Sequence, residues 1–580
     1  MCTWYEYELP EYTACTIKTK AVGKDECTRI PARILGLEKP KSALKQKYFI
    51  ESYIQSIIES APMKKTSIAI GGNGDQISQF IGEKAVQVCA ANEISNIYIG
   101  TNNLFILPAI SRFIRENKLE GGIYVYVARN YTNRKKVNVG IRFLGTNGGV
   151  PSEKIMKKTL DTFKTLTSHK KINVNFPLSE VENYSFRVIQ SVDRARPPST
   201  VTVHIIDGKK DYIRFLKESF DFPRIKSLIT GGRIEKRFDL VVDCKEGGAG
   251  PYLEEILVNE LGAKKSCIKN GVPSSCFHKK YFGPEVEYNL QMINELVLRE
   301  QDMGVIIDGN GARSAFFAKG GHFVSHGDTF ALLVDHYHCI PLFQKKIVKG
   351  IARTVYASKS VDPVILKLGL SLYETADGWR YFNSLLEHQL ISLCADDDFG
   401  IGAYHIGERD GILPILAWLS IIAHLRKPVR QILQQHWDEY GKLFRTTLIY
   451  EDLCPKLTND TISNVEKLMK DGCFVGKAFQ VGHMRVEVKK AGGFDYKHPL
   501  TKASTKEQAI VINTKLGRVI LRVFTYIGGV SDLQVIIESF SNGVAYCVDK
   551  ISMAVPLTKF IMLATKYPAM INRSDPDRIF

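Results

Sequence analysis

The stretch that decides the fold of this chain is Val305-Ile306-Ile307-Asp308-Gly309-Asn310-Gly311-Ala312-Arg313-Ser314. A short apolar run that ends in a glycine-rich turn is typical of a buried strand that delivers a loop at its C-terminal end. Open α/β sheets place their binding loops at that end of the strands. The turn carries Asp308 and Arg313, and its glycines let the backbone approach an ion or a phosphate closely. An ordinary β-turn with a hydrogen-bonding aspartate is the other interpretation of this stretch alone.

Strand and helix patterns alternate on both sides of this stretch, which predicts parallel sheets covered by helices. The predicted strands lie at 66–70, 96–99, 122–127, 201–206 and 238–242 and at Val305. The predicted helices lie at 47–60, 77–91, 108–117, 211–220, 252–261, 328–335 and 411–425. The fold class is therefore α/β, with three mixed sheet-and-helix domains followed by a smaller α+β domain. The predicted domains are 1–199, 200–315, 316–428 and 429–580.

The chain has 580 residues, too many for one hydrophobic core, and a formal net charge of +17. A basic surface attracts nucleic acid, anionic lipid or an acidic protein polymer such as a cytoskeletal filament. The charge is dispersed and is not interleaved with aromatic residues, so we expect no specific nucleic-acid partner. A solvated basic surface without a partner is the alternative. The protein partner, whether a filament or another acidic surface, is not identified by the sequence.

The cysteines and the apolar segments bear on the cellular compartment. The twelve cysteines form no C-x-x-C pair and no Cys/His cluster at zinc spacing, which favours free thiols and a reducing compartment. The first residues do not have the pattern of a signal peptide. The longest apolar stretch, 412–423, contains Pro414 and is too short to span a bilayer. We therefore expect a cytoplasmic protein without a transmembrane segment, monomeric as an isolated chain.

Several short segments, spread from about residue 16 to about residue 570, occur in an order that is typical of one protein family. They are Gly71-Gly72-Asn73-Gly74, Asn147-Gly148-Gly149, Gly250-Pro251-Tyr252, Leu372-Tyr373-Glu374-Thr375, Gly378-Trp379, Phe399-Gly400, Asp410-Gly411 and Leu416-Ala417-Trp418-Leu419-Ser420. Together they resemble the eukaryotic phosphoglucomutases of the α-D-phosphohexomutase superfamily, which include parafusin-like and aciculin-like members. The resemblance implies a heart-shaped fold of four domains. It also implies an ancestral reaction, the interconversion of glucose 1-phosphate and glucose 6-phosphate through a phosphoserine and Mg²⁺.

The chain departs from this family at the phosphoserine. The family loop reads T-A-S-H-N-P, and here the matching segment is Val127-Ala128-Arg129-Asn130-Tyr131-Thr132, with Arg129 at the serine position. A guanidinium cannot carry a phosphoryl group, so the nucleophile of the family is missing. A nucleophile relocated to Thr132 is the alternative.

The metal loop is also altered. The family loop D-G-D-G-D-R supplies three carboxylates to Mg²⁺, whereas this chain has Asp308, Asn310 and Ala312, followed by Arg313. Hard cations need several oxygen ligands, so we expect that the chain binds no metal here and needs no cofactor. Arg129 could place its charge where the ion sits in the family and pair with Asp308. The other interpretation is that Arg129 points into an open cleft.

The sugar loop of the family, G-E-E-S-F-G, is matched by Ala395-Asp396-Asp397-Asp398-Phe399-Gly400. Asp396 and Asp397 are one methylene shorter than the family's glutamates, and Asp398 adds a charge that would repel a phosphosugar. Arg409 occupies the position of a nearby lysine of the family. Gly378 and Trp379 are the same residues as in the family. A solvated acidic turn is the simpler interpretation of this segment.

The phosphate loop keeps Arg522, but the bulky residues Phe524 and Tyr526 follow it. Gln534 stands where the family has its final arginine, so the cradle for the non-reacting phosphate is altered as well. Because all four loops differ, we predict a phosphoglucomutase-like pseudoenzyme with a binding or structural role, associated with the cytoskeleton as some relatives are. Two alternatives are a residual or altered phosphosugar mutase and a non-catalytic sensor of a sugar phosphate or anion.

Overall fold

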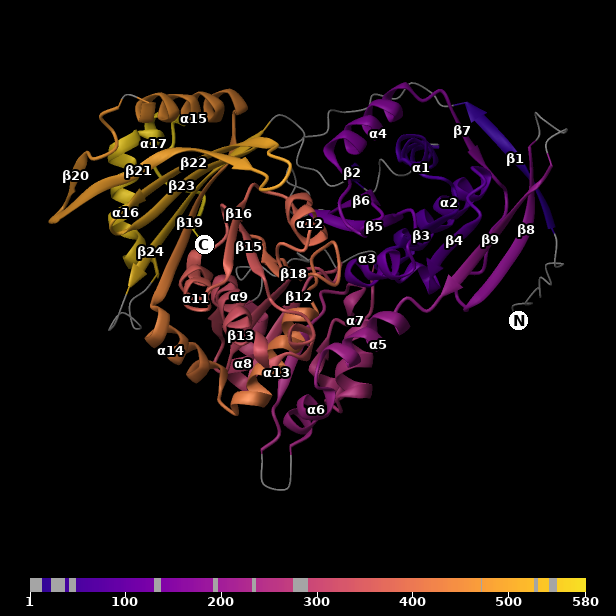
Figure 1. Cartoon of the computed structure of the whole chain (residues 1–580), viewed down its shortest axis with the longest axis horizontal. Coiled ribbons are helices and arrows are strands. Elements are labelled where there is room, and N and C mark those ends of the chain that lie inside the picture. The colour runs from indigo at the N-terminus through magenta and orange to yellow at the C-terminus, as the bar shows by residue number, and fades with distance from the viewer. Residues whose placement is uncertain are drawn as a thin grey trace.

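The computed structural model describes residues 13–21, 37–40, 48–129, 137–190, 197–231, 236–274, 290–470, 472–525, 530–541 and 550–579. These residues form four β-sheets, each packed against helices (Figure 1). The first sheet and the C-terminal sheet lie on opposite sides of the molecule, and the second and third sheets lie between them. The predicted mixed α/β, multi-domain fold class is confirmed.

The first sheet has nine strands in the order β2-β6-β5-β3-β4-β9-β8-β1-β7, with a parallel centre formed by β5, β3, β4 and β9. Its strands are β1 (Thr13–Ala21), β2 (Leu37–Pro40), β3 (Ser67–Gly71), β4 (Asn96–Gly100), β5 (Gly122–Arg129), β6 (Val137–Leu144), β7 (Ser168–Lys171), β8 (Glu182–Gln190) and β9 (Ser199–Ile206). Its helices are α1 (Phe49–Ser60), α2 (Gln76–Ala91), α3 (Leu107–Glu116) and α4 (Glu153–Thr165). Side chains of α1 and α2 share one apolar cluster with the inner strands.

The second sheet has the order β11-β10-β12-β13-β14. Its strands are β10 (Leu240–Asp243), β11 (Ile268–Lys269), β12 (Met303–Ile307), β13 (Ser314–Ala318) and β14 (His322–Val324). Its helices are α5 (Lys210–Ser219), α6 (Phe222–Thr230), α7 (Ala249–Leu253), which continues as a π-helix over Glu254–Glu260, and α8 (Leu290–Arg299). All five residues of β12 are buried, as the apolar run at 305–307 predicts.

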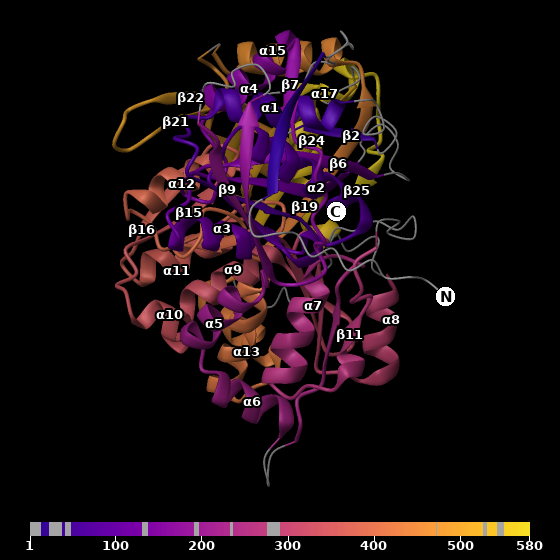
Figure 2. The same ribbon diagram turned by 90° about the vertical axis from the view of Figure 1, so that its right-hand side faces the viewer.

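The third sheet has the order β16-β15-β17-β18. Its strands are β15 (Gly350–Thr354), β16 (Ser371–Thr375), β17 (Leu393–Ala395) and β18 (Ile401–Ala403). The helices around it are α9 (His326–Asp335), α10 (Pro341–Gln344), α11 (Asp362–Lys367), α12 (Trp379–Glu387), α13 (Leu413–Leu425) and α14 (Val429–Tyr440). Figure 2 shows α5, α6, α10 and α13 gathered at the lower end of the molecule.

The fourth sheet is antiparallel, in the order β20-β21-β22-β23-β24-β19-β25. Its strands are β19 (Lys442–Leu453), β20 (Ala478–Val481), β21 (Met484–Lys497), β22 (Ser504–Thr514), β23 (Gly517–Thr525), β24 (Ser531–Ser541) and β25 (Arg578–Ile579). Its helices are α15 (Pro455–Lys470), α16 (Lys550–Thr565) and α17 (Tyr567–Met570). This sheet with its helices is the predicted α+β unit.

Three predicted domain boundaries differ from the sheets that the structure shows. The boundary at 199/200 cuts through β9 after its first residue, yet β9 pairs with β4 and β8 of the first sheet. The boundary at 315/316 divides β13, which pairs with β12 in a hairpin of the second sheet. The boundary at 428/429 separates α14 from α13, although apolar side chains of both helices share one cluster. In each case hydrogen-bond pairing or burial across the boundary outweighs the local pattern.

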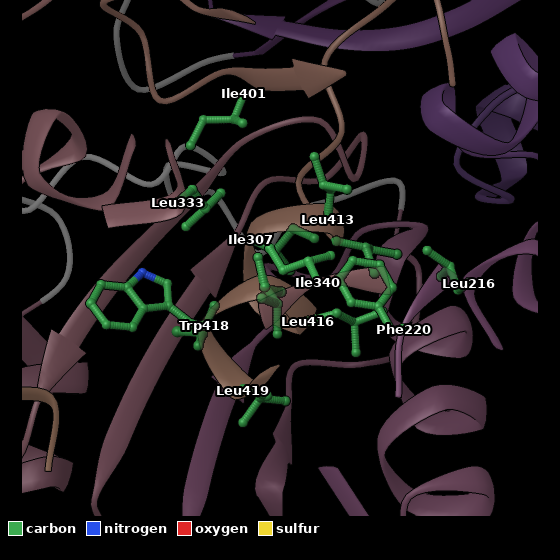
Figure 3. Close-up of a cluster of buried hydrophobic side chains, with 14 of the residues drawn as sticks. Leu216, Phe220, Ile307, Leu333, Ile340, Ile401, Leu413, Leu416, Trp418 and Leu419 are labelled. Carbon is green, nitrogen blue, oxygen red and sulfur yellow. The ribbon is translucent and has the colours of Figure 1, made fainter. Parts of the chain in front are cut away.

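Helix α13 lies at the centre of the largest apolar cluster, where the second and third units meet. Every residue from Leu413 to Ala423 is buried. Leu416 and Leu413 lie close to Ile307 of β12, and the Trp418 ring lies on the opposite side of the cluster from Phe220 (Figure 3). A helix that is apolar on all sides must be surrounded by protein, so α13 holds the two units together.

The described residues contain no helix that is long and apolar enough to cross a membrane. Cys89, Cys244, Cys267, Cys339 and Cys394 are buried free thiols, and Cys454 and Cys473 are exposed free thiols.

A buried polar contact also joins the second and third units. The hydroxyl of Tyr212 on α5 donates to the carboxylate of Asp410, with oxygen distances of 2.7 and 2.8 Å. The same carboxylate accepts from the backbone amides of Ile412 and Leu413 at the start of α13, both at 3.0 Å. His405 Nε2 lies 2.8 Å from it. This aspartate thus fixes the first turn of α13 and the position of α5 together.

We expect Tyr212→Phe to lower the free energy of unfolding by about 1–3 kcal/mol, because it removes a donor from a buried carboxylate. Denaturant unfolding followed by circular dichroism measures the change. The half-buried Tyr98, whose ring stacks on His204 at 4.5 Å, provides the control. Tyr98→Phe should change stability by less than about 0.5 kcal/mol. Equal effects of the two substitutions would contradict the assigned role of Tyr212.

Candidate functional site

The segment that matches the metal loop of the family is the turn between β12 and β13, and Asp308 points back into this turn. The Asp308 side chain is 1% exposed, and its Oδ1 accepts from the amides of Ala312 at 2.7 Å and Arg313 at 3.2 Å. Its Oδ2 accepts from Arg313 Nε at 3.0 Å. The tight turn depends on Gly311, whose φ of +69° is unfavourable for residues with a side chain. Both carboxylate oxygens therefore bind groups of the loop itself.

Arg313 joins the former metal loop to the former sugar loop. Its Nη1 lies 2.9 and 3.0 Å from the two carboxylate oxygens of Asp398, while its Nε binds Asp308. A β-bridge between Arg313 and Gly400 supports the same contact along the backbone. The side chain of Asp398 remains 50% exposed. One guanidinium thus bridges two carboxylates from loops that are far apart in the sequence.

Asn310 is held in the same turn by its backbone. Its carbonyl oxygen accepts from the amide of Leu107 at 3.4 Å and from the hydroxyl of Tyr124 at 3.5 Å. These contacts tie the metal loop to the first unit. Ala312 is buried and contributes only a methyl group.

Arg129 ends strand β5, where it pairs in register with Val137 of β6. Its side chain, the predicted pair with Asp308, and Thr132 all lie outside the described residues. The described partner of Asp308 is Arg313.

The former sugar loop is organised around Asp396, which is buried. Its Oδ2 accepts from Trp379 Nε1 at 2.7 Å and from Arg409 Nε at 2.6 Å. Its Oδ1 accepts from the amides of Asp398 at 2.8 Å and Gly400 at 2.9 Å. Burial raises the pKa of Asp396, but the Arg409 guanidinium and the Trp379 hydrogen bond hold it below the usual value. The structure thus brings together the five predicted residues of this loop, including Gly378, whose backbone begins α12 directly before Trp379.

Arg522 on β23 is the surviving residue of the former phosphate loop. Its Nη1 lies 2.5 Å from Asp397 Oδ2, and its Nη2 lies 2.5 Å from Asp377 Oδ2. The guanidinium carbon lies 3.8 Å from the ring centre of Tyr356 and 3.9 Å from that of Phe524. The Arg522 side chain is 4% exposed. We call these five residues the Arg522 cluster.

The charge of Arg522 is stabilised although water is excluded. Burial lowers the pKa of an arginine, but Asp397 and Asp377 together raise the pKa of Arg522 above its usual value. Charge-assisted hydrogen bonds to carboxylates and contacts with aromatic faces both favour a guanidinium. Tyr526, the third predicted residue of this loop, lies outside the described residues.

Asp377 and Tyr356 belong to this site, and the sequence analysis did not predict them. Asp377 directly precedes the predicted Gly378-Trp379 pair, which is the only local signal of its position. Asp377 and Arg522 are 145 residues apart, so their contact depends on how the third and fourth units pack.

A second ionic cluster that the sequence analysis missed lies beside the first. Arg518 Nε binds Glu538 at 2.5 Å, and its Nη1 and Nη2 donate to the carbonyls of Val355 at 3.1 Å and Ala357 at 2.6 Å. Burial raises the pKa of Glu538, but Arg518 and Arg445 hold it below the usual value. Both clusters lie at the contact between the third and fourth sheets and join side chains of the one to groups of the other.

Two family models match the chain. Domain I of phosphoglucomutase/phosphomannomutase (alpha/beta/alpha) matches residues 38–170, and domain III of the same family matches residues 326–440. Phosphoglucomutase-1 of Homo sapiens is 31% identical over 538 residues, which cover 91% of this chain and 93% of that protein. Phosphoglucomutase-like protein 5 of Rattus norvegicus is 30% identical over 513 residues, covering 87% and 89%.

A solved structure shows the same fold. The open form of the exocytosis-sensitive phosphoprotein pp63/parafusin, a phosphoglucomutase from Paramecium, has a TM-score of 0.85 and 23% sequence identity. The match covers 98% of this chain and 100% of that chain. The sequence relatives, the two family models and the four-sheet architecture agree, and the chain belongs to the phosphoglucomutase family of the phosphohexomutase superfamily.

Proposed function

We propose that this chain is a phosphoglucomutase-like pseudoenzyme, which binds a partner and does not interconvert glucose 1-phosphate and glucose 6-phosphate. The observation that carries the proposal is the internal pairing of the former-site arginines that the structure describes. Each of the three binds carboxylates of the chain itself: Arg313 binds Asp308 and Asp398, Arg409 binds Asp396, and Arg522 binds Asp377 and Asp397.

This pairing works against a phosphosugar ligand. A phosphate that approached Arg522 would have to displace two carboxylates which already make charge-assisted hydrogen bonds. Those carboxylates would then lose their charge-assisted hydrogen bonds to Arg522, which is costly. The ring centres of Tyr356 and Phe524 lie 3.8 and 3.9 Å from the guanidinium carbon, so the contact with the third sheet would also have to open.

The same proposal includes the loss of the Mg²⁺ site and of the nucleophile. Mg²⁺ requires several oxygen ligands in near-octahedral geometry. Asp308 uses both carboxylate oxygens within its own loop, Ala312 offers no ligand atom, and the Arg313 cation lies within 3.0 Å of Asp308. The residue at the serine position is Arg129, which cannot accept a phosphoryl group.

For the partner we propose an acidic protein surface, such as a cytoskeletal filament in the cytoplasm. The net charge of +17 supports this, because a basic protein is attracted to an acidic polymer. Helix α4 presents exposed lysines in support of the same idea: Lys154, Lys157, Lys158 and Lys164.

Our first prediction under this proposal is the absence of mutase activity. With Mg²⁺ and the bisphosphate activator, a coupled assay that converts glucose 1-phosphate to glucose 6-phosphate should give no signal above the blank. A phosphoglucomutase-1 assayed in parallel confirms that the assay works. Turnover that persists in Arg129→Ala and disappears in Thr132→Ala would contradict the proposal and identify Thr132 as a relocated nucleophile.

The second prediction concerns the metal. Calorimetric titration with Mg²⁺ should reveal no site tighter than roughly millimolar, because too few oxygen ligands remain. The triple variant Arg129→Ser, Asn310→Asp and Ala312→Asp should recover measurable Mg²⁺ binding with little turnover, since the Arg522 cluster still occupies the phosphate cradle. A stoichiometric site of micromolar affinity in the unmodified chain would overturn this part of the proposal.

The third prediction concerns the Arg522 cluster itself. Arg522→Ala takes away the cation that binds Asp377 and Asp397, whose side chains are 23% and 14% exposed, and should lower the free energy of unfolding by about 1–3 kcal/mol. Asp397→Ala should also destabilise the protein, and the double variant should lose less than the sum of the two. Arg485→Ala, on the exposed surface of β21, is the matched control and should have little effect. Strict additivity in this cycle would mean that Arg522 and Asp397 do not stabilise each other.

A further inference from the structure

A cluster of nitrogen and sulfur side chains lies where α9 ends, away from the former active site. His336, His338 and Cys339 each offer one metal-binding atom, and these three atoms lie within 4.8 Å of one another. Within the described part of the chain, the imidazole rings and the thiol of this group make no hydrogen bond to another side chain. The three residues are therefore available as ligands.

The backbone holds these residues in a defined turn. The His336 amide donates to the Leu332 carbonyl at 2.9 Å and ends α9, and the Cys339 amide donates to the His336 carbonyl at 2.9 Å. Tyr337–Cys339 is a 3₁₀ turn, and side chains three residues apart eclipse one another in such a turn. This geometry brings His336 and Cys339 to the same side. The His338 ring adds a third ligand, with its centre 5.8 Å from that of His336.

The charges around the cluster are mixed but leave it accessible to a cation. Asp335 Oδ2 lies 3.9 Å from His336 Nε2 and adds a negative charge beside the group. Arg224 is a cation close enough to act on the Cys339 thiol, and its Nη1 lies 3.1 Å from His424 Nδ1. His338 is exposed and Cys339 is buried, so the group opens to solvent on one side only.

We propose that His336, His338 and Cys339 bind one divalent transition-metal ion of the zinc class, with solvent at the fourth position. Histidine nitrogen and cysteine sulfur are the ligands that zinc prefers, whereas Mg²⁺ and Ca²⁺ require oxygen. In a tetrahedral zinc site the ligand atoms lie about 3.5 Å apart, so the side chains must move together by roughly 1 Å. The exposed His338 is free to make this movement. Binding replaces the thiol proton of Cys339, which passes to the solvent.

Helix α9 separates this site from the former active site. At its other end His326 Nε2 lies 3.0 Å from the carbonyl oxygen of Asp396, and a ten-residue helix is about 15 Å long. The proposed ion is therefore independent of the lost Mg²⁺ site. The sequence analysis overlooked it because the run His336-Tyr337-His338-Cys339 does not have the paired spacing of a zinc finger.

Titration of the full chain with Co²⁺ tests the proposal, because a cobalt–thiolate bond gives a charge-transfer absorption that histidine alone does not give. We expect one equivalent of Co²⁺ to produce this band and Zn²⁺ to abolish it by displacement. Cys339→Ser should remove the band, and His338→Ala should weaken Zn²⁺ binding by more than about tenfold. His338 is exposed, so its replacement should leave the metal-free protein folded, which circular dichroism verifies.

Matched controls use a thiol and a histidine elsewhere on the surface. Cys454 and His483 are both exposed, and neither Cys454→Ser nor His483→Ala should alter the band or the Zn²⁺ affinity. The proposal is overturned if the unmodified chain gives no thiolate band, or if Cys339→Ser and His338→Ala bind Co²⁺ and Zn²⁺ as the unmodified chain does.

Discussion

A guanidinium buried between two carboxylates and two aromatic rings holds the C-terminal sheet against the third sheet. Arg522 and Phe524 come from β23, whereas Asp377, Asp397 and Tyr356 come from the third unit. If the two sheets separate, the ion pairs of Arg522 with Asp377 and Asp397 are broken and the charged groups become exposed to water. A buried ion pair that loses one partner is strongly destabilising, although an intact pair need not be better than an apolar contact. The chief effect of the Arg522 cluster is therefore to fix how the two sheets are placed relative to each other. One placement satisfies all of its charged groups, and a shifted placement would leave some of them unpaired.

The pairing of a buried basic side chain with carboxylates of the same chain also occurs in the other loops that match the active site of the family. Asp308 with Arg313 and Asp396 with Arg409 are each drawn within hydrogen-bonding distance. Such pairs satisfy the polar groups that burial would otherwise leave unpaired. The loops thus gain a structural use for side chains that could have served a charged ligand.

The sequence predicted the fold well where burial is periodic or continuous. The run at 305–307 became the buried strand β12, and the apolar segment 411–425 became the central helix α13. The clustering of Asp396, Trp379 and Arg409 also agrees with the resemblance to the family. Contacts across units could not be read from local patterns, and Asp377 and Tyr356 were missed for that reason. Domain boundaries were displaced because β9, β13 and α14 have the same local pattern in either unit, and only their pairing or burial decides where they belong.

Fold and chemistry depend on different residues in this chain, so the one can be judged separately from the other. The largest apolar cluster gains its free energy from the area that it removes from water, which many combinations of apolar residues can supply. A metal or phosphoryl site instead requires particular atoms at particular distances, and a single replacement such as Ala312 removes a ligand outright. Overall identity of 31% to phosphoglucomutase-1 therefore establishes the fold and the family. Activity has to be judged on the few loop residues, and in this chain those residues bind one another.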